Sequence, residues 1–179
     1  MQGVRLLASA PLRVRQPVEA ANLSYKGDWA ETQQLLQERA RIWEQGRESA
    51  ARLLNSELSR FLLETKVRDG DKMVGLLITD RYGALVAASS EPDHYFLSHE
   101  PWWEALQAGE LDRVYISGVI PGQEGSFRTP EETIDIAVPI LDDHQHAVIG
   151  AIKASYRFDS LFAMIKEIRI GQTGHAMLF

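Results

Sequence analysis

A change in periodicity near residue 70 limits what this chain can fold into more than any other feature. From Asp28 to about Lys66 the sequence contains no proline, only one glycine (Gly46), and many of the strongest helix formers, Ala, Leu, Glu, Gln and Arg. Asp28 and Glu31 have the spacing of a capping box. Beyond the charged turn VRDGDK, apolar residues come in short runs and in alternation, which is typical of strands. We therefore predict one long helix over 28–66, followed by a sheet.

The expected helix carries an apolar stripe. The members of the stripe recur at helical spacing and are Leu36, Trp43, Ala50, Leu54, Leu58 and Phe61. Such a helix would be on the order of 55 Å long, more than the width of a compact core of about 100 residues. We expect part of it to project and to pair with a partner helix. The alternative is that the whole helix packs on its own domain, because only its second half is strongly apolar.

The rest of the chain predicts a sheet with short helices. The expected strands are 73–80, 84–89, 113–119, 133–141 and 147–156, and the first two form a hairpin. Pro101 suits the start of a short helix that ends at Gly109, and 158–169 has the pattern of an amphipathic helix. Pro139 predicts an edge or a bulge in its strand. Five mostly antiparallel strands with helices on one side predict the α+β class.

Composition and motifs exclude several functions. The chain is 45% apolar and 25% charged, which is typical of a globular protein, and its net charge of −6 with no basic run argues against a nucleic-acid partner. The absence of cysteine excludes disulfides, a thiolate nucleophile and cysteine-based zinc sites. No apolar run approaches the roughly 20 residues of a membrane span, and the first residues lack the apolar centre of a secretory signal. Any membrane anchor is expected outside this sequence.

No enzyme motif is recognisable. The sequence contains no G-x-S-x-G, P-loop, G-x-G-x-x-G or H-E-x-x-H, so we predict neither catalytic residues nor a cofactor. His144 and His146, two apart in a polar turn, could form a weak metal site with Asp142 or Asp143. A solvated hairpin tip explains the same residues, and we predict no metal.

A binding site is the better hypothesis, and the doublet Trp102–Trp103 is its first candidate. Each indole offers a large rigid face and an N–H donor. Neighbours on a helix differ in direction by about 100°, so the two rings cannot point the same way. We expect one to pack under the following loop and the other to border a ligand cavity. The alternative is that both are core anchors.

Polar candidates lie on the strands and loops around this doublet. Tyr115 and Ser117 share one face of their strand, and Tyr95 lies in an aromatic loop segment. Asp135 interrupts an apolar run and could pair with Arg128, or either residue could fix a charged ligand group. Simple solvent exposure of the Asp135 face is the alternative.

The order of these patterns resembles a known family. The succession LITDRYGALVAAS, PWWEAL, VYIS, IDIAVPILDDHQHAVIGAIKAS and IRIGQTGHAMLF resembles the Cache family, the PAS-like extracytoplasmic sensor modules of bacterial histidine kinases, chemoreceptors and cyclic-dinucleotide enzymes. The final GQTGHAMLF is similar to the start of the second, membrane-proximal module of double-Cache proteins. The resemblance therefore implies three parts: an N-terminal segment with the long helix (1–66), a membrane-distal sensor module (67–168), and the start of a second module (169–179).

The resemblance also implies a ligand site between the sheet and the helical or loop excursion. Matching positions are Trp102, Trp103, Tyr115 and Ser117, and looser ones are Tyr95, Arg128 and Asp135. Amino-acid-binding members carry an arginine two residues before the first aromatic of the pair, where this chain has Glu100. A carboxylate there would repel a carboxylate ligand, so we expect a cationic, amine-bearing or neutral small molecule.

Together these features predict a non-enzymatic, periplasmic sensory input domain of an inner-membrane receptor, acting in two-component signalling or chemotaxis. A homodimer through the long helix would transmit ligand binding. The alternative function is a ligand-free dimerisation or protein-interaction domain of such a receptor.

Overall fold

The computed structural model describes residues 11–45, 47–108, 114–144, 147–167, 169–170 and 174–175. Its helical elements are η1 (Pro11–Arg15), α2 (Gln16–Leu23), α3 (Trp29–Gln45), α4 (Arg47–Leu54), α5 (Glu57–Asp69), η2 (Gly70–Lys72), α6 (Pro101–Ala108) and α7 (Phe158–Glu167). Its strands are β1 (Met73–Asp80), β2 (Leu85–Ala88), β3 (Tyr115–Ile116), β4 (Thr133–Leu141), β5 (Val148–Arg157), β6 (Arg169–Ile170) and β7 (Gly174–His175).

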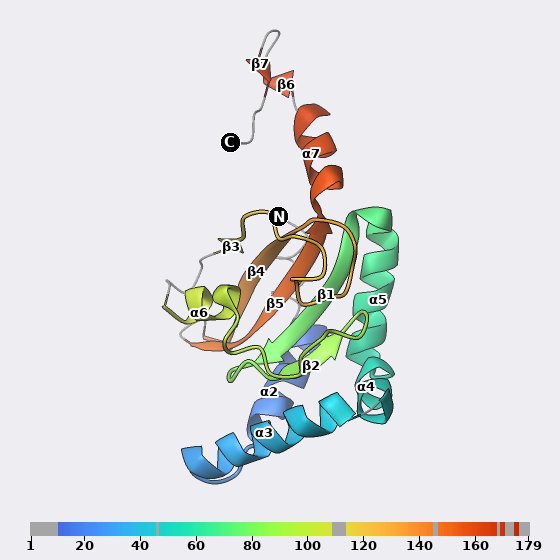
Figure 1. Ribbon diagram of the computed structural model, residues 1–179. Coiled ribbons are helices and arrows are strands. Elements are labelled where there is room, and N and C mark those ends of the chain that lie inside the picture. The colour runs from blue at the N-terminus through green and yellow to red at the C-terminus, as the bar shows by residue number, and fades with distance from the viewer. Residues whose placement is uncertain are drawn as a thin grey trace.

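Five of the strands form one antiparallel sheet with the order β2-β1-β5-β4-β3 (Figure 1). The expected α+β class is therefore confirmed, and β1 and β4 coincide with the predicted ranges. Strand β3 is shorter than expected, because it pairs with β4 only at Tyr115 and Ile116. Pro139 lies beyond that pairing, where β4 pairs with β5 alone, and so it occupies an edge position as predicted.

Helices α2 and α5 cover one face of the sheet. Val18 of α2 and Leu62 of α5 are fully buried there. They pack with the strand residues that point to the same face, Leu76, Ile78, Val138, Ile140 and Ile152. In Figure 1, α5 runs along the β1–β2 side and α2 lies behind the sheet. The N-terminal helices thus complete the hydrophobic core of the sheet.

The opposite face is covered by α6 and by the loops that flank it. Trp102, Trp103 and Leu106 of α6 pack there with Phe127, against Leu77, Ala137 and Ala151 of the strands. Helices therefore lie on both faces, and the expectation of helices on one side is wrong. The physical reason is that the second face of the sheet also carries apolar side chains, Leu77, Ala137 and Ala151, which need a cover from water.

The single helix expected over 28–66 is also wrong. Its start is confirmed, since Asp28 accepts a hydrogen bond from the Glu31 N–H at 3.0 Å. The chain leaves the helical conformation at Ser56, whose backbone is extended and whose hydroxyl accepts the Ser59 N–H at 3.1 Å. This N-cap starts α5 in a new direction, and Figure 1 shows α3 lying across the end of the sheet instead of continuing α5.

No helix in the described ranges is long and apolar enough to cross a membrane. Of the segment expected to begin a second module, only the small β6–β7 pair is described, and the remainder of 169–179 lies outside the described residues.

Candidate ligand site

A buried ionic network lies on the α6 face of the sheet. Strand β4 supplies Asp135, β5 supplies Lys153 and Ser155, and the loop before β4 supplies Ser126. In the register of the two strands Asp135 lies opposite Ser155, so Lys153 is its diagonal neighbour on the same face. The sheet itself therefore brings these side chains together.

The network is short-ranged and enclosed. Lys153 Nζ donates to Asp135 Oδ2 and to Ser126 Oγ, both at 2.7 Å, and Ser155 Oγ donates to Asp135 Oδ1 at 2.5 Å. The exposed fractions are 0% for Lys153 and 3% for Asp135. Replacing a buried ion pair of this kind by apolar residues of similar volume is often neutral or stabilising, so stability alone does not account for it.

Two aromatic rings close the network from the α6 side. Lys153 Nζ lies 5.7 Å from the ring centroid of Trp102 and 5.8 Å from that of Phe127, both within the range of cation–π attraction. The Trp102 Nε1 donor is buried and has no acceptor among the described residues. The result is a cation held by a carboxylate, a hydroxyl and two rings.

Three further candidates lie beside this network. Burial raises the pKa of Tyr115, and the negative charges of Asp135 and Glu100 raise it further, so each of these two carboxylates lies near Tyr115. The Ser117 hydroxyl accepts the Asp135 N–H at 2.9 Å and donates to the Gly118 carbonyl at 2.6 Å. Ser117 therefore extends the pairing at the β3–β4 edge.

The structure does not bring Arg128 to Asp135. Arg128 Nε instead lies 2.7 Å from Asp93 Oδ1, and the cation paired with Asp135 is Lys153. Tyr95 is also separate from the network: its ring lies 6.0 Å from that of Trp43 on α3. Burial raises the pKa of Tyr95, against the lowering effect of the nearby Arg39 charge.

The two tryptophans of the doublet have different neighbours. Both are buried, and their rings meet edge to face at 5.7 Å, with an angle of 81° between the planes. Both therefore anchor the core, as the alternative interpretation has it. Trp102 covers Lys153, whereas Trp103 also borders a pocket next to α3.

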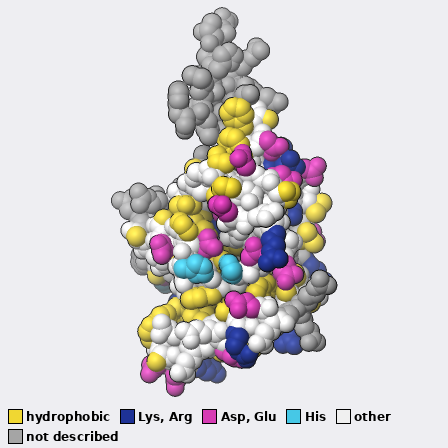
Figure 2. Space-filling model, in the orientation of Figure 1, with side chains coloured by type: hydrophobic (Ala, Val, Ile, Leu, Met, Phe, Trp, Pro, Cys, Tyr) yellow, Lys and Arg dark blue, Asp and Glu magenta, His cyan; other side chains and the backbone are white. Residues whose placement is uncertain are grey.

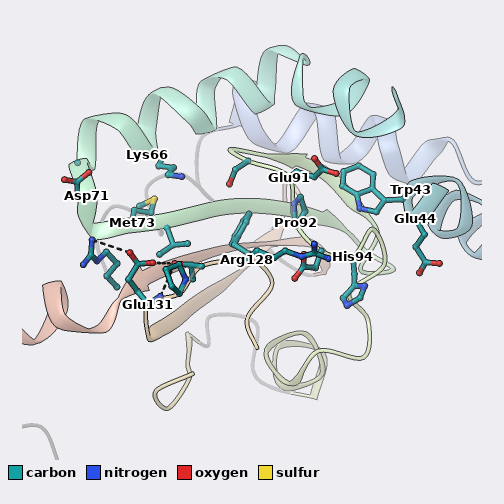
Figure 3. A pocket seen from close by; sticks show the side chains of 18 residues that line it. Trp43, Glu44, Lys66, Asp71, Met73, Glu91, Pro92, His94, Arg128 and Glu131 are labelled. Carbon is teal, nitrogen blue, oxygen red and sulfur yellow. Dashed lines mark hydrogen bonds and ion pairs between the residues drawn. The ribbon is translucent and has the colours of Figure 1, made fainter. Parts of the chain in front are cut away.

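An open cleft of about 980 Å³ lies next to the network (Figure 3). It runs between the end of α5, the loop at 90–94 and the loop at 127–131. Phe127 lies in the wall of the cleft, and its ring centroid is 5.8 Å from Lys153 Nζ, so this residue links the cleft to the ionic network. The Phe127 ring packs directly on Gly75 of β1. A Cβ at that position would lie only 2.5 Å from the ring, so only glycine leaves room for it.

Acidic side chains outnumber basic ones in the lining of the cleft. The acidic ones are Glu44, Asp71, Glu91, Asp93 and Glu131, and the basic ones are Lys66, Arg128 and Arg157. Figure 2 shows acidic and basic side chains and histidines together on this side of the molecule. Two of the basic groups are already paired, Arg128 with Asp93 and Arg157 with Asp159 and Glu131, and the remaining charges of the lining are still mostly negative.

Within the described ranges, no group of three or more His, Asp or Glu side chains is arranged to hold a metal ion. His144 belongs to the turn between β4 and β5, and His146 lies outside the described residues. Sequence reasoning missed Ser126, Lys153 and Ser155. The signal for Lys153 was available, since a lysine stands at a core-facing position of the strand run AVIGAIKASY.

No family model matches the chain, and no curated protein is similar to it in sequence. Among solved structures, it is similar to the extracellular domain of rpHK1S-Z16, a protein assigned as a histidine kinase, with a TM-score of 0.49 and 13% identity over 95% of this chain and 62% of that one. It is also similar to the ligand-binding domain of the Pseudomonas fluorescens chemoreceptor CtaA in complex with L-isoleucine, with a TM-score of 0.46 and 13% identity over 94% of this chain and 64% of that one. For the ligand-binding domain of the Pseudomonas aeruginosa amino acid chemoreceptor PctC in complex with GABA, the TM-score is 0.43 and the identity 15%, over 75% of this chain and 65% of that one. The chain thus spans less than two thirds of the length of each.

Proposed function

We propose that this chain is a ligand-binding sensory input domain, the extracytoplasmic part of a transmembrane receptor such as a histidine kinase, a chemoreceptor or a cyclic-dinucleotide enzyme. The observation that carries the proposal is the buried Lys153–Asp135 pair, which lies next to a large cleft and shares Phe127 with its wall. A ligand that enters the cleft would contact the Phe127 ring and act through it on the buried ion pair. The sheet order and the resemblance to Cache modules support the same function.

The charge of the cleft supports a ligand class. With an acidic excess in its lining and Glu100 near Tyr115, the site favours a cationic, amine-bearing or neutral small molecule over an organic acid. In this proposal Arg128 borders the entrance. Trp102, Tyr115 and Asp135 form the layer behind Phe127, with Trp103, Ser117 and Tyr95 supporting it.

Transmission would run through α5, not through one continuous rod. Helix α5 packs its Leu58 and Leu62 on the sheet and leaves Leu63 and Val67, one turn apart, 45% and 69% exposed. We propose that these two side chains lie in a homodimer contact of the membrane-anchored protein. Light scattering of the chain at rising concentration, compared with a Leu63→Glu variant, tests this contact, and a monomer at every concentration would count against it.

A thermal-shift screen with primary amines, neutral compounds and organic acids tests the ligand site. We expect an amine to raise the melting temperature of the wild type, and to do so less in Glu91→Gln and Glu131→Gln, which lose charge in the cleft. Glu104→Gln, on the exposed side of α6, is the matched control and should respond as the wild type does. Stabilisation by organic acids alone would overturn the ligand class.

One observation favours the second function, a ligand-free dimerisation or interaction domain. Phe127 and Lys153 fill the sheet face next to Asp135, and neither the cleft nor the pocket at Trp103 is lined by Tyr115 or Asp135. If no compound of any class shifts the melting temperature while the Leu63→Glu variant loses its dimer, this second function is the correct one.

A further inference from the structure

A second, smaller pocket lies at the junction of α3 with the body of the domain. Its volume is about 350 Å³, and it shares no lining residue with the cleft. Its walls come from α3, from the turn between β1 and β2, from the loop at 96–98 and from α6. We propose that this pocket, which we call the aromatic pocket, binds a small planar aromatic carboxylate.

Four aromatic side chains make the walls, namely Trp29, Tyr82, Phe96 and Trp103. The rings of Trp29 and Tyr82 lie 5.5 Å apart, and Trp103 is buried at the base of α6. Trp29 is 55% exposed, which is unusual for so large an apolar surface. Rigid faces on several sides with one ring still open to solvent fit a flat ring as ligand.

Arg81 supplies the only charge in the described lining of the aromatic pocket. Its guanidinium lies 4.7 Å from the centroid of the Tyr82 ring, and no ion pair of Arg81 is found among the described residues. The remaining polar side chains are neutral: they are the amides of Gln33, Gln37 and Gln107, the hydroxyls of Ser98 and Tyr82, and the indole N–H groups of Trp29 and Trp103. A guanidinium that rests on an aromatic wall without a counter-ion selects a carboxylate, which it can hold through two parallel hydrogen bonds.

The wall opposite α3 is rigid. Asp80 Oδ1 accepts the N–H groups of Tyr82 at 2.8 Å and of Ala84 at 3.0 Å, which fixes the turn. The Leu97 N–H donates to the Gly83 carbonyl at 2.8 Å. Gly83 has a φ of +84°, and a Cβ there would lie 2.9 Å from the Ser98 backbone, so the turn and the loop at 96–98 are in direct contact. A preformed wall lowers the entropic cost of binding.

Binding there would act on α3. Trp29, Gln33 and Gln37 follow one another at intervals of four residues and so present one helix face to the pocket. A ligand held between this face and Arg81 favours the docked position of α3 over any other. The domain would then respond to an aromatic anion at this site independently of what the cleft binds, and the inference does not rest on the function proposed above.

Titration calorimetry with phenylacetate tests the proposal on the whole chain. A ligand of about 10 non-hydrogen atoms is expected to bind with a Kd on the order of 1 mM. Two comparison compounds separate the contributions: 2-phenylethanol keeps the ring and lacks the carboxylate, and cyclohexylacetate keeps the carboxylate and lacks the flat ring. Both should bind about tenfold more weakly than phenylacetate.

Two surface variants with matched controls assign the site. Arg81→Gln should weaken phenylacetate about tenfold and leave 2-phenylethanol unchanged, and Trp29→Ala should weaken both. Arg68→Gln and Leu23→Ala remove an exposed arginine and an exposed apolar side chain elsewhere and should change neither. Because Arg81 and Trp29 are exposed, the fold is expected to survive both changes. Absence of phenylacetate binding at about 20 mM, or equal binding by all variants, would overturn the proposal.

Discussion

Lys153 is the residue on which the candidate ligand site depends. Replacing it by methionine would keep most of the side-chain volume and leave the Asp135 carboxylate buried without its cation. We expect the free energy of unfolding to fall by about 3–5 kcal/mol. Urea denaturation followed by circular dichroism measures the change, with Lys72→Met at the exposed end of η2 as the control.

The double variant Lys153→Met/Asp135→Asn distinguishes the contribution of the two charges to stability from that of the packing of Lys153. It removes both charges, so most of the lost stability should return. A double variant as unstable as the single one would show that Lys153 matters through its packing under Trp102, not through its charge.

The buried carboxyl group of Asp80 should make the stability of the fold depend on pH. Burial raises the pKa of Asp80 above its usual value of 3.8, although hydrogen bonds from the Tyr25 hydroxyl and from the Tyr82 and Ala84 N–H groups oppose the rise. A carboxyl with a raised pKa binds its proton more tightly in the folded state. Its contribution to stability is therefore complete below the unfolded pKa and is lost as the pH rises through the folded pKa.

The variant Asp80→Asn has no such titration. The stability of the wild type relative to this variant should thus decline as the pH rises above the usual pKa of an aspartate, as measured by urea denaturation at each pH. Asp159→Asn is a control of opposite sign, because the hydrogen bond from Arg157 lowers the pKa of Asp159. A difference between wild type and Asp80→Asn that does not vary with pH would contradict the prediction.

The sequence indicated one of the four members of the ionic network, Asp135. Asp135 was recognisable because it interrupts an apolar alternation, but its partner was sought at Arg128. Identifying Lys153 requires the register of β4 against β5, in which Asp135 lies opposite Ser155. That register depends on the connecting turn, and a shift of one residue would move every side chain to the other face. The lining of the cleft was equally unpredictable, since the loops at 90–94 and 127–131 have no periodicity.

At the scale of elements, the strands were predictable and the helix break was not. The residue pattern of β1 and β4 indicates both where each strand begins and ends and which side chains share a face. The helical spacing of apolar residues, in contrast, continues from Leu54 to Leu58 across the end of α4, so it gives no sign of the break. The signal that overrides it is local: Ser56 precedes Glu57 and caps Ser59, the pattern of a helix N-terminus.

Ser56→Ala tests how much this cap contributes. Losing the hydrogen bond to the Ser59 N–H should lower the free energy of unfolding by about 1 kcal/mol, measured by urea denaturation. Ser24→Ala removes a hydroxyl that donates to the Ala21 carbonyl at an exposed helix end and should change stability by less than about 0.5 kcal/mol. Equal effects of the two substitutions would mean that the break at Ser56 is set by packing of α5 alone.

At the scale of the whole molecule, the helices before residue 67 and the sheet after it bury one another. Val14 and Val18 are fully buried, and so is Leu62, with Leu58 6% exposed. Burying four such side chains stabilises a fold by about 6–12 kcal/mol. That is comparable to the entire stability of a typical domain, roughly 5–15 kcal/mol. The division at residue 66 therefore separates parts of one hydrophobic core.

We expect a fragment of residues 67–168 not to fold by itself, because the face of the sheet formed by Leu76, Ile78, Val138, Ile140 and Ile152 would be left in water. A fragment of residues 11–168, which keeps α2 and α5 with their contacts, is the matched control and should unfold cooperatively. Amide proton dispersion in NMR spectra and urea denaturation distinguish the two. A well-dispersed spectrum from residues 67–168 would show that the sheet and α6 fold without the N-terminal helices, and would contradict the prediction.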